Sequence, residues 1–253
     1  MALVCVEALS NGARDRAIEL SERWKIPLAE NFKGTSGVKA VVSDLYVGLG
    51  FVEDKRGKPY YVDFQVQDWK SRLAKGLPRN HIFRRALGHK DKALSVIDAT
   101  AGFGQDAMLA VCLGCEVTAI EKSPVVVEVL RDGLERAMRE DESSRSKFGA
   151  LNLVEADAET HLLKADAADV IYLDPMFNKP KKSAKSPKEM QLLQDLLAPL
   201  PEAAEFERLF KVAFDRTKHR VVVKQPLKGK ALGRAPNHSF KGQSIRYDVY
   251  VKS

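Results

Sequence analysis

The stretch A-L-S-V-I-D-A-T-A-G-F-G-Q-D, residues 93–106, decides the fold. It begins with an apolar run of the length of a buried strand, which ends at Asp98. Gly102 and Gly104 then allow a tight turn in which the backbone can approach a ligand closely. A helix is expected over 106–113, and the N–H groups of its first turn can bind an anionic group. The stretch therefore predicts a strand, a glycine loop and a helix that bind a cofactor.

The glycine loop alone does not identify the cofactor. A dinucleotide fingerprint would have a third glycine at position 107, where this chain has Ala107, a replacement that the pattern sometimes allows. NAD and other nucleoside cofactors both remain open at this point.

Downstream of the loop, strand and helix patterns alternate, which predicts an α/β fold with a mostly parallel sheet and helices on both faces. The expected strands are 116–121, 151–155, 170–174 and 219–224, and the expected helical regions are 124–140 and 189–217, with a polar loop at 141–147. The last two strands, 237–241 and 244–251, are expected to pair antiparallel at the edge of the sheet.

Acidic residues stand at the ends of consecutive expected strands. Glu121 ends the second strand, seventeen residues after Gly104, where a carboxylate can accept hydrogen bonds from two ribose hydroxyls. Asp157 follows the third strand and could accept the amino group of an adenine, or simply cap the next helix. Because the carboxyl ends of parallel strands meet at one edge, one crevice would collect these groups.

The fourth strand runs into V-I-Y-L-D-P-M-F, residues 170–177. Pro175 cannot donate to a sheet ladder, so the strand is expected to stop there and to present Asp174 and Phe177 at its carboxyl end. A carboxylate and a carbonyl can accept hydrogen bonds from an exocyclic amine, while a ring can stack on a flat base. This pattern suits chemistry on a nucleobase nitrogen, although an ordinary strand that ends in a turn would look similar.

The chain before residue 93 divides into two parts. Residues 1–67 are expected to form a small α+β domain, with a strand at 2–6, a helix at 14–25, and then two or three strands in the stretches 38–52 and 59–65, which a turn joins. Residues 68–92 form a basic helical connector that Pro78 divides into two helices, and residues 93–253 form the cofactor-binding domain. The connector, which includes Arg84 and Arg85, is either a phosphate-binding surface or a solvated basic face.

Composition bounds the class of protein. The chain has 253 residues, 45% of them hydrophobic and 30% charged, and no apolar run of membrane-spanning length, so no membrane partner is expected. The first residues, M-A-L-V-C-V-E, have an acidic residue at position 7 and no basic region before an apolar stretch, which argues against a secretory signal and favours a cytoplasmic location. A net charge of +7 favours a polyanionic partner. Cys112 and Cys115 form a C-x-x-C pair without further zinc ligands nearby, so buried thiols are expected and no metal.

The residues quoted above resemble the class I S-adenosylmethionine (SAM) methyltransferases, and D-P-M-F is similar to the D-P-P-Y type motif that these enzymes use on exocyclic amines. More narrowly, V-I-D-A-T-A-G-F-G-Q-D-A, I-E-K-S-P-V-V, V-I-Y-L-D-P-M-F with its following lysines, and R-V-V-V-K-Q-P resemble the RsmJ family of small-subunit ribosomal RNA guanine-N2 methyltransferases. The match covers residues 93–250 well and the N-terminal part more loosely.

The resemblance implies a Rossmann-like methyltransferase sheet and SAM as the cofactor. It also implies cofactor contacts at Gln105, Asp106, Glu121, Lys122, Asp157, Ala158 and Asp174. The strand and the glycine loop add three more cofactor-binding candidates, Asp98, Gly102 and Gly104.

The catalytic hypothesis concerns three residues of the D-P-M-F motif. Asp174 and the carbonyl of Pro175 would accept hydrogen bonds from a guanine amine, while Phe177 stacks on the extruded base, and this chemistry needs no metal. The expected partner is ribosomal RNA or the small ribosomal subunit. The candidate RNA contacts are Arg84 and Arg85 of the connector and the lysines after the motif, which could also be a mobile solvated loop: Lys179, Lys181, Lys182, Lys185 and Lys188.

Two other classes of function stay open on the sequence. An NAD-dependent oxidoreductase could use the same glycine loop, but it would need a proton-transferring Tyr/Lys or His pair near the crevice, and no compelling pair is evident. A non-catalytic RNA-binding protein with a relic cofactor site is the other alternative.

Overall fold

The computed structural model describes residues 3–90, 92–176, 187–200, 202–229 and 234–252. The chain forms two compact units. Unit 1 comprises Met1–Asp63, Ser123–Arg136 and Asn178–Leu200, and unit 2 comprises Phe64–Lys122, Ala137–Phe177 and Pro201–Ser253. The predicted boundaries at residues 67 and 92 stay a prediction. Among the described residues, no helix combines the length and the apolar character that crossing a membrane requires.

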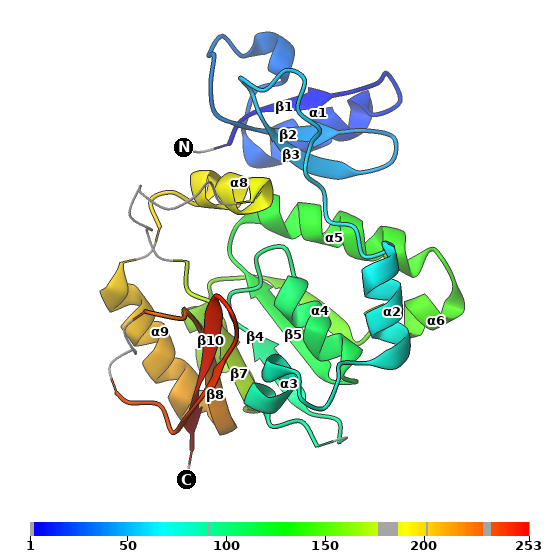
Figure 1. The fold of residues 1–253 in the computed structure, drawn as a ribbon. Helices are drawn as coiled ribbons and strands as arrows, with labels where there is room; N and C mark the ends of the chain where they lie inside the picture. The colour runs from blue at the N-terminus through cyan, green and yellow to red at the C-terminus, as the bar shows by residue number, and fades with distance from the viewer. Residues whose placement is uncertain (1–2, 91, 177–186, 201, 230–233, 253) are drawn as a thin grey trace. The chain divides into compact units, whose positions relative to one another are not determined.

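Unit 2 contains a seven-stranded sheet in the described part of the chain, in the order β6-β5-β4-β7-β8-β10-β9. The strands from β6 to β8 are parallel, and β10 runs antiparallel to both β8 and β9 (Figure 1). Their bounds are β4 Ser95–Asp98, β5 Glu116–Glu121, β6 Leu151–Glu155, β7 Ala168–Leu173, β8 Thr217–Pro226, β9 His238–Lys241 and β10 Ile245–Val251. This topology confirms the predicted Rossmann-like α/β class with an antiparallel C-terminal edge.

The strand order reverses between β4 and β7. From β4 the chain continues through β5 and β6 on one side, and it then returns to place β7 and β8 on the other side. In open α/β sheets such a switch point leaves a crevice outside the carboxyl ends of the two central strands, where ligands bind. The ends of β4 and β7 are therefore where the site is expected.

The helices of unit 2 follow most of the predicted spans. Pro78 does separate two short helices. The polar loop expected at 141–147 is wrong, because Asp141 begins a helix there by accepting a hydrogen bond from the Ser144 N–H at 2.7 Å. The bounds are α2 Gln67–Lys75, α3 Ile82–Leu87, α4 Gln105–Cys112, α6 Glu142–Phe148, α7 Ala158–Lys164 and α9 Ala203–Arg216, while α5, Pro124–Met138, contributes residues to both units.

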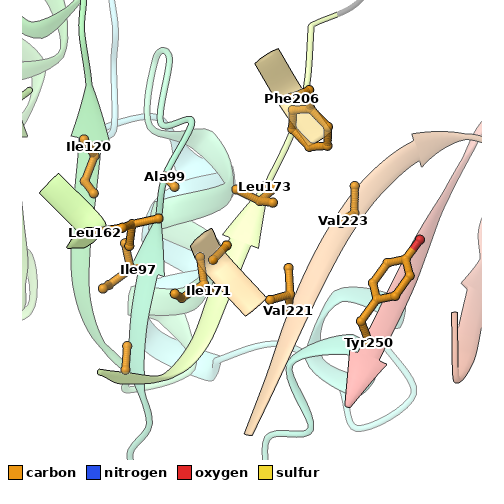
Figure 2. Packing of buried hydrophobic residues seen from close by; sticks show 12 residues of the cluster. Ile97, Ala99, Ile120, Leu162, Ile171, Leu173, Phe206, Val221, Val223 and Tyr250 are labelled. Carbon is orange, nitrogen blue, oxygen red and sulfur yellow. The ribbon is translucent and has the colours of Figure 1, made fainter. Parts of the chain in front are cut away.

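Buried aliphatic residues on the central strands form the core beneath the site. Figure 2 shows Ile97, Ile171 and Val221 on the successive strands β4, β7 and β8. Leu162 of α7 and Phe206 of α9 belong to the same buried cluster. Side chains on both faces of the central strands β4 and β7 are buried, so the sequences of these strands are mostly apolar. This pattern is typical of a parallel sheet with both faces covered.

Unit 1 contains a three-stranded sheet in which β1, Leu3–Ala8, is parallel to β2, Val38–Val42, and β2 is antiparallel to β3, Val47–Phe51. The unit also holds α1 Arg14–Trp24, a short 3₁₀ helix at Ala29–Asn31, and α8 Lys188–Leu196.

The strand predictions in unit 1 are partly wrong. Residues 38–52 do not form one strand but a hairpin, because the Ser43 hydroxyl accepts hydrogen bonds from the N–H groups of Leu45 and Tyr46 and closes a turn. Residues 59–65 are not a strand either, since only Tyr60 forms a bridge, with Leu49 of β3.

A buried carboxylate links α1 to α5 within unit 1. Glu128 has a side-chain exposure of 3% and accepts hydrogen bonds from Arg16, Arg23 and Arg131. We expect Glu128→Ala to lower the free energy of unfolding by about 2 kcal/mol, because three partly exposed guanidinium groups lose the carboxylate that they share. Denaturant unfolding measures the loss, and the control Glu19→Ala, which removes an exposed partner of Arg16, is expected to change stability by less than about 1 kcal/mol. Equal stability of the two variants would contradict this view of Glu128.

Candidate active site

The loop after β4 is tied to the end of β7. The Ala99 N–H donates to the Tyr172 carbonyl at 3.0 Å, and the Asp174 N–H donates to the Thr100 hydroxyl oxygen at 2.6 Å. Asp98, the last residue of β4, and Asp174, which follows β7, are thereby held at the switch point of the sheet.

The glycine loop is fixed against the end of β5. Gly102 and Gly104 have φ angles of 53° and 75°, which lie in the left-handed region that glycine adopts without strain. The Gly102 N–H donates to the Glu121 carboxylate at 3.1 Å, and Glu121 is only 7% exposed. A buried carboxylate therefore sets the loop conformation and lies beside the loop at the same edge of the sheet.

A lysine joins two of the site's carboxylates. The Lys224 ammonium donates to Asp106 Oδ2 at 2.7 Å and to Asp174 Oδ2 at 2.9 Å. The Tyr172 hydroxyl donates to the same Asp106 oxygen at 2.8 Å. Burial opposes the charge on Lys224, but the two neighbouring carboxylates outweigh burial and raise its pKa above the ordinary value.

Burial raises the pKa of Asp98 to about 8, and the nearby charges of Asp106 and Asp174 add to this effect. A hydrogen bond from the Thr100 N–H, at 3.0 Å, and the charge of Lys224 act in the opposite direction. This raised pKa favours the protonated form of Asp98 at neutral pH. We name Asp98, Asp106 and Asp174 the carboxyl cluster.

Replacing Asp98 should change how stability depends on pH. The folded protein keeps a proton on Asp98 that the unfolded chain releases above its ordinary pKa near 4, so this group costs stability as pH rises from about 4 to 8. The amide that replaces it in Asp98→Asn would not titrate. We expect the stability of Asp98→Asn relative to wild type to increase by at least about 2 kcal/mol between pH 5 and pH 7.5, measured by denaturant unfolding at each pH. A difference that is independent of pH would contradict the protonated state.

The other proposed cofactor residues lie at the same edge of the sheet or close to it. Gln105 begins α4 and is exposed, and Lys122, just after β5, is also exposed. Asp157 caps α7 by accepting a hydrogen bond from the Thr160 N–H at 2.9 Å, as the helix-cap alternative predicts. Ala158 is the first residue of α7.

The predicted RNA contacts have different surroundings. Arg84 is half-buried and donates to the Leu77 carbonyl at 3.0 Å, whereas Arg85 is exposed and its guanidinium lies 4.7 Å from the centre of the Phe240 ring. The Lys188 ammonium donates to Asp54 and to the Lys58 carbonyl.

Pro175 lies within the described residues and is half-buried. Part of the predicted site lies outside the described residues, namely Phe177, Lys179, Lys181, Lys182 and Lys185.

Sequence reasoning missed Lys224, Tyr172 and Tyr247. A signal for Lys224 was available, because it ends the run H-R-V-V-V-K and so stands at the carboxyl end of its strand, as the predicted acids do. Tyr172 and Tyr247 are buried, with ring centroids 6.3 Å apart, and burial raises the pKa of both hydroxyls. Their place beside Asp106 depends on strand pairing that the sequence does not display.

The cysteines are not placed for catalysis. Cys112 and Cys115 are buried without a disulfide, and burial raises the pKa of each thiol to about 11. Within the described ranges, no three His, Cys, Asp or Glu side chains are grouped so that they could hold a metal ion.

Comparisons with known proteins agree with this geometry. Residues 19–252 match the model of a family described as "Putative SAM-dependent methyltransferase". A SAM-dependent methyltransferase from Neisseria gonorrhoeae has a similar crystal structure, with a TM-score of 0.72 and 27% identity over 97% of this chain and 95% of that one. The fold and the site thus define a class I SAM-dependent methyltransferase, and its cofactor is SAM.

The curated relatives identify the family. The chain is 36% identical to the ribosomal RNA small subunit methyltransferase J of Thioalkalivibrio sulfidiphilus, over 98% of this chain and 97% of that protein. It is 37% identical to the protein of the same name from Coxiella burnetii, over 93% of this chain and 91% of that protein. The chain belongs to the ribosomal RNA small subunit methyltransferase J family, the RsmJ family.

Proposed function

We propose that this protein transfers a methyl group from SAM to the exocyclic N2 amine of a guanosine in small-subunit ribosomal RNA. The relatives' name supports the RNA substrate. The observation that carries the proposal is Asp174-Pro175 at the carboxyl end of β7, beside the glycine loop and joined to it through Thr100. Such a substrate favours a cytoplasmic location, where ribosomal subunits are made.

The chemistry requires that the acceptor amine be oriented. The lone pair of a guanine N2 amine is delocalised into the ring, so it attacks only when the amine is held and directed toward the methyl group. Asp174 and the Pro175 carbonyl would accept the two N–H groups, and Phe177 would stack on the extruded base. Asp174 would hold the amine while the amine takes the methyl group that SAM supplies, and the proton that the amine loses would pass to the Asp174 carboxylate and then to water.

The residues around the loop fit SAM. The N–H groups at the start of α4 can donate hydrogen bonds to the carboxylate of the cofactor's amino-acid part. The glycines in the left-handed conformation have no side chain and allow the cofactor to approach the backbone closely. The Glu121 carboxylate would bind the ribose hydroxyls and Asp157 the adenine amino group. Gln105, Lys122 and Ala158 would complete the contacts, with Asp98 beneath the loop. When bound, SAM supplies a methyl group already activated by its positive sulfur.

An exposed arginine and the net charge of the chain support an RNA substrate. The exposed guanidinium of Arg85 over Phe240 offers both a charge for a phosphate and a planar group for a base. The net charge of +7 has the sign that a polyanion requires. Lys179, Lys181, Lys182 and Lys185, which follow Asp174 in the sequence, would contact the RNA backbone.

The structure does place a tyrosine and a lysine together, which the oxidoreductase alternative requires. Tyr172 and Lys224 both donate to Asp106. An oxidoreductase tyrosine that transfers a proton needs a lowered pKa, however, and burial raises the pKa of Tyr172 well above its ordinary value. The pair therefore does not favour hydride chemistry over methyl transfer.

A direct test uses the purified protein. We expect calorimetry to detect binding of SAM and not of NAD, and we expect tritium from the SAM methyl group to enter small-subunit RNA as N2-methylguanosine. Label in another nucleoside would contradict the proposed acceptor, and binding of SAM without any transfer would favour a non-catalytic RNA-binding protein.

A further inference from the structure

Lys224 occupies a position that the proposed chemistry does not yet use. It lies on β8, where Leu173 of β7 pairs with Val223, so the next residue along β8 stands beside Asp174. Its ammonium bonds Asp174 and Asp106 at 2.9 and 2.7 Å, and its side chain is 24% exposed. A largely buried cation thus contacts the carboxylate proposed to hold the acceptor amine.

The surroundings of Lys224 contain several acidic groups. Asp98 faces it from β4, Asp106 from α4, Asp174 from the end of β7, Tyr172 from β7 and Tyr247 from β10. Burial raises the pKa of Asp98 and of both tyrosine hydroxyls, and the direct contacts of the Lys224 ammonium are with Asp106 and Asp174. Asp106 and Asp174 share this one ammonium, and a cation beside two carboxylates favours their charged forms.

We propose that Lys224 is a positioning residue for methyl transfer, whose ammonium keeps the Asp174 carboxylate ionised and oriented, through bonds shared with Asp106, to accept the amine of the base. This inference rests on the proposed function. Without the ammonium, the carboxyl cluster would hold a second proton to higher pH, and a protonated Asp174 would present a donor where the amine needs an acceptor.

The test is the rate of methyl transfer against pH, at saturating SAM and RNA. We expect Lys224→Met to reduce kcat about a hundredfold at pH 6.5 and to recover much of this loss by pH 9, as the cluster ionises. Lys224→Arg, which keeps the positive charge, is expected to retain the wild-type profile within about tenfold. Lys218→Met is the matched control, because Lys218 lies on the same strand, is exposed and is 3.8 Å from Asp169, so its profile should equal that of wild type.

A loss that is the same at every pH would overturn the proposal, because it would show that Lys224 only supports the fold. Thermal unfolding checks that the variants fold. If Lys224→Met does not fold, Lys224→Gln replaces it, because glutamine keeps a hydrogen-bond donor without the charge.

A second measurement separates this inference from the proposed function. Carbon-13 NMR of labelled aspartate carboxyl groups follows proton binding by the cluster with no RNA present. Titrations that Lys224→Met leaves unchanged would overturn the role of Lys224, even if the protein methylates guanine. A shift of the titrations to higher pH supports it, even if the acceptor proves to be another amine.

Discussion

Asp174→Ala is expected to reduce methyl transfer at least about a thousandfold, while the protein still folds and binds SAM. The variant removes the carboxylate that would orient the acceptor amine, and orientation is the main contribution that the protein makes when the methyl group is already activated. It also leaves Lys224 bonded to Asp106 alone, so part of the local hydrogen bonding survives. Single-turnover rates with labelled SAM measure the loss.

Two further variants make the Asp174 test specific. Asp174→Asn keeps an oxygen acceptor and is expected to retain more activity than the alanine variant. Asp166→Ala removes an exposed carboxylate that follows α7, away from the site, and should leave the rate unchanged. Full activity in Asp174→Ala would remove Asp174 from the mechanism.

Replacing Lys179, Lys181, Lys182 and Lys185 together with glutamine should weaken RNA binding about a hundredfold at 0.1 M salt. Each lysine that neutralises a phosphate of single-stranded RNA contributes about 0.7 to the slope of log affinity against log salt, so the slope should fall by as much as about 3. Equilibrium binding at several salt concentrations measures both quantities.

Lys188 provides the comparison for the lysine variant. Because its ammonium bonds Asp54 and the Lys58 carbonyl, Lys188→Gln is expected to change the salt slope less than any lysine that contacts phosphate. A slope that the fourfold replacement leaves unchanged would show that these lysines are only a solvated surface.

Much of the sheet could be predicted because its determinants are local. The apolar runs that end at Asp98, Glu121 and Asp174 mark buried strands, and each acid marks a carboxyl end. Where short-range hydrogen bonds compete with such patterns, prediction from apolar runs fails. The Ser43 hydroxyl closes a turn, so residues 38–52 form a hairpin where a strand was predicted. The Asp141 cap begins a helix where a loop was predicted.

The site was predictable only in outline. The acids could be assigned to one crevice from their strand ends alone, but the contacts of Lys224 arise from the pairing of β7 with β8. That pairing joins residues fifty positions apart, as the bond from Lys224 to Asp174 shows. The raised pKa of Asp98 likewise depends on burial among groups from several elements, which no local pattern displays.

The most direct test of guanine N2 methylation is mass spectrometry of nucleosides from small-subunit ribosomal RNA, with fragment mapping, in cells with and without this protein. We expect cells that lack it to lose N2-methylguanosine at one position, and we expect the wild-type gene, but not Asp174→Ala, to restore it. An unaltered N2-methylguanosine content and map in those cells would contradict the proposed function.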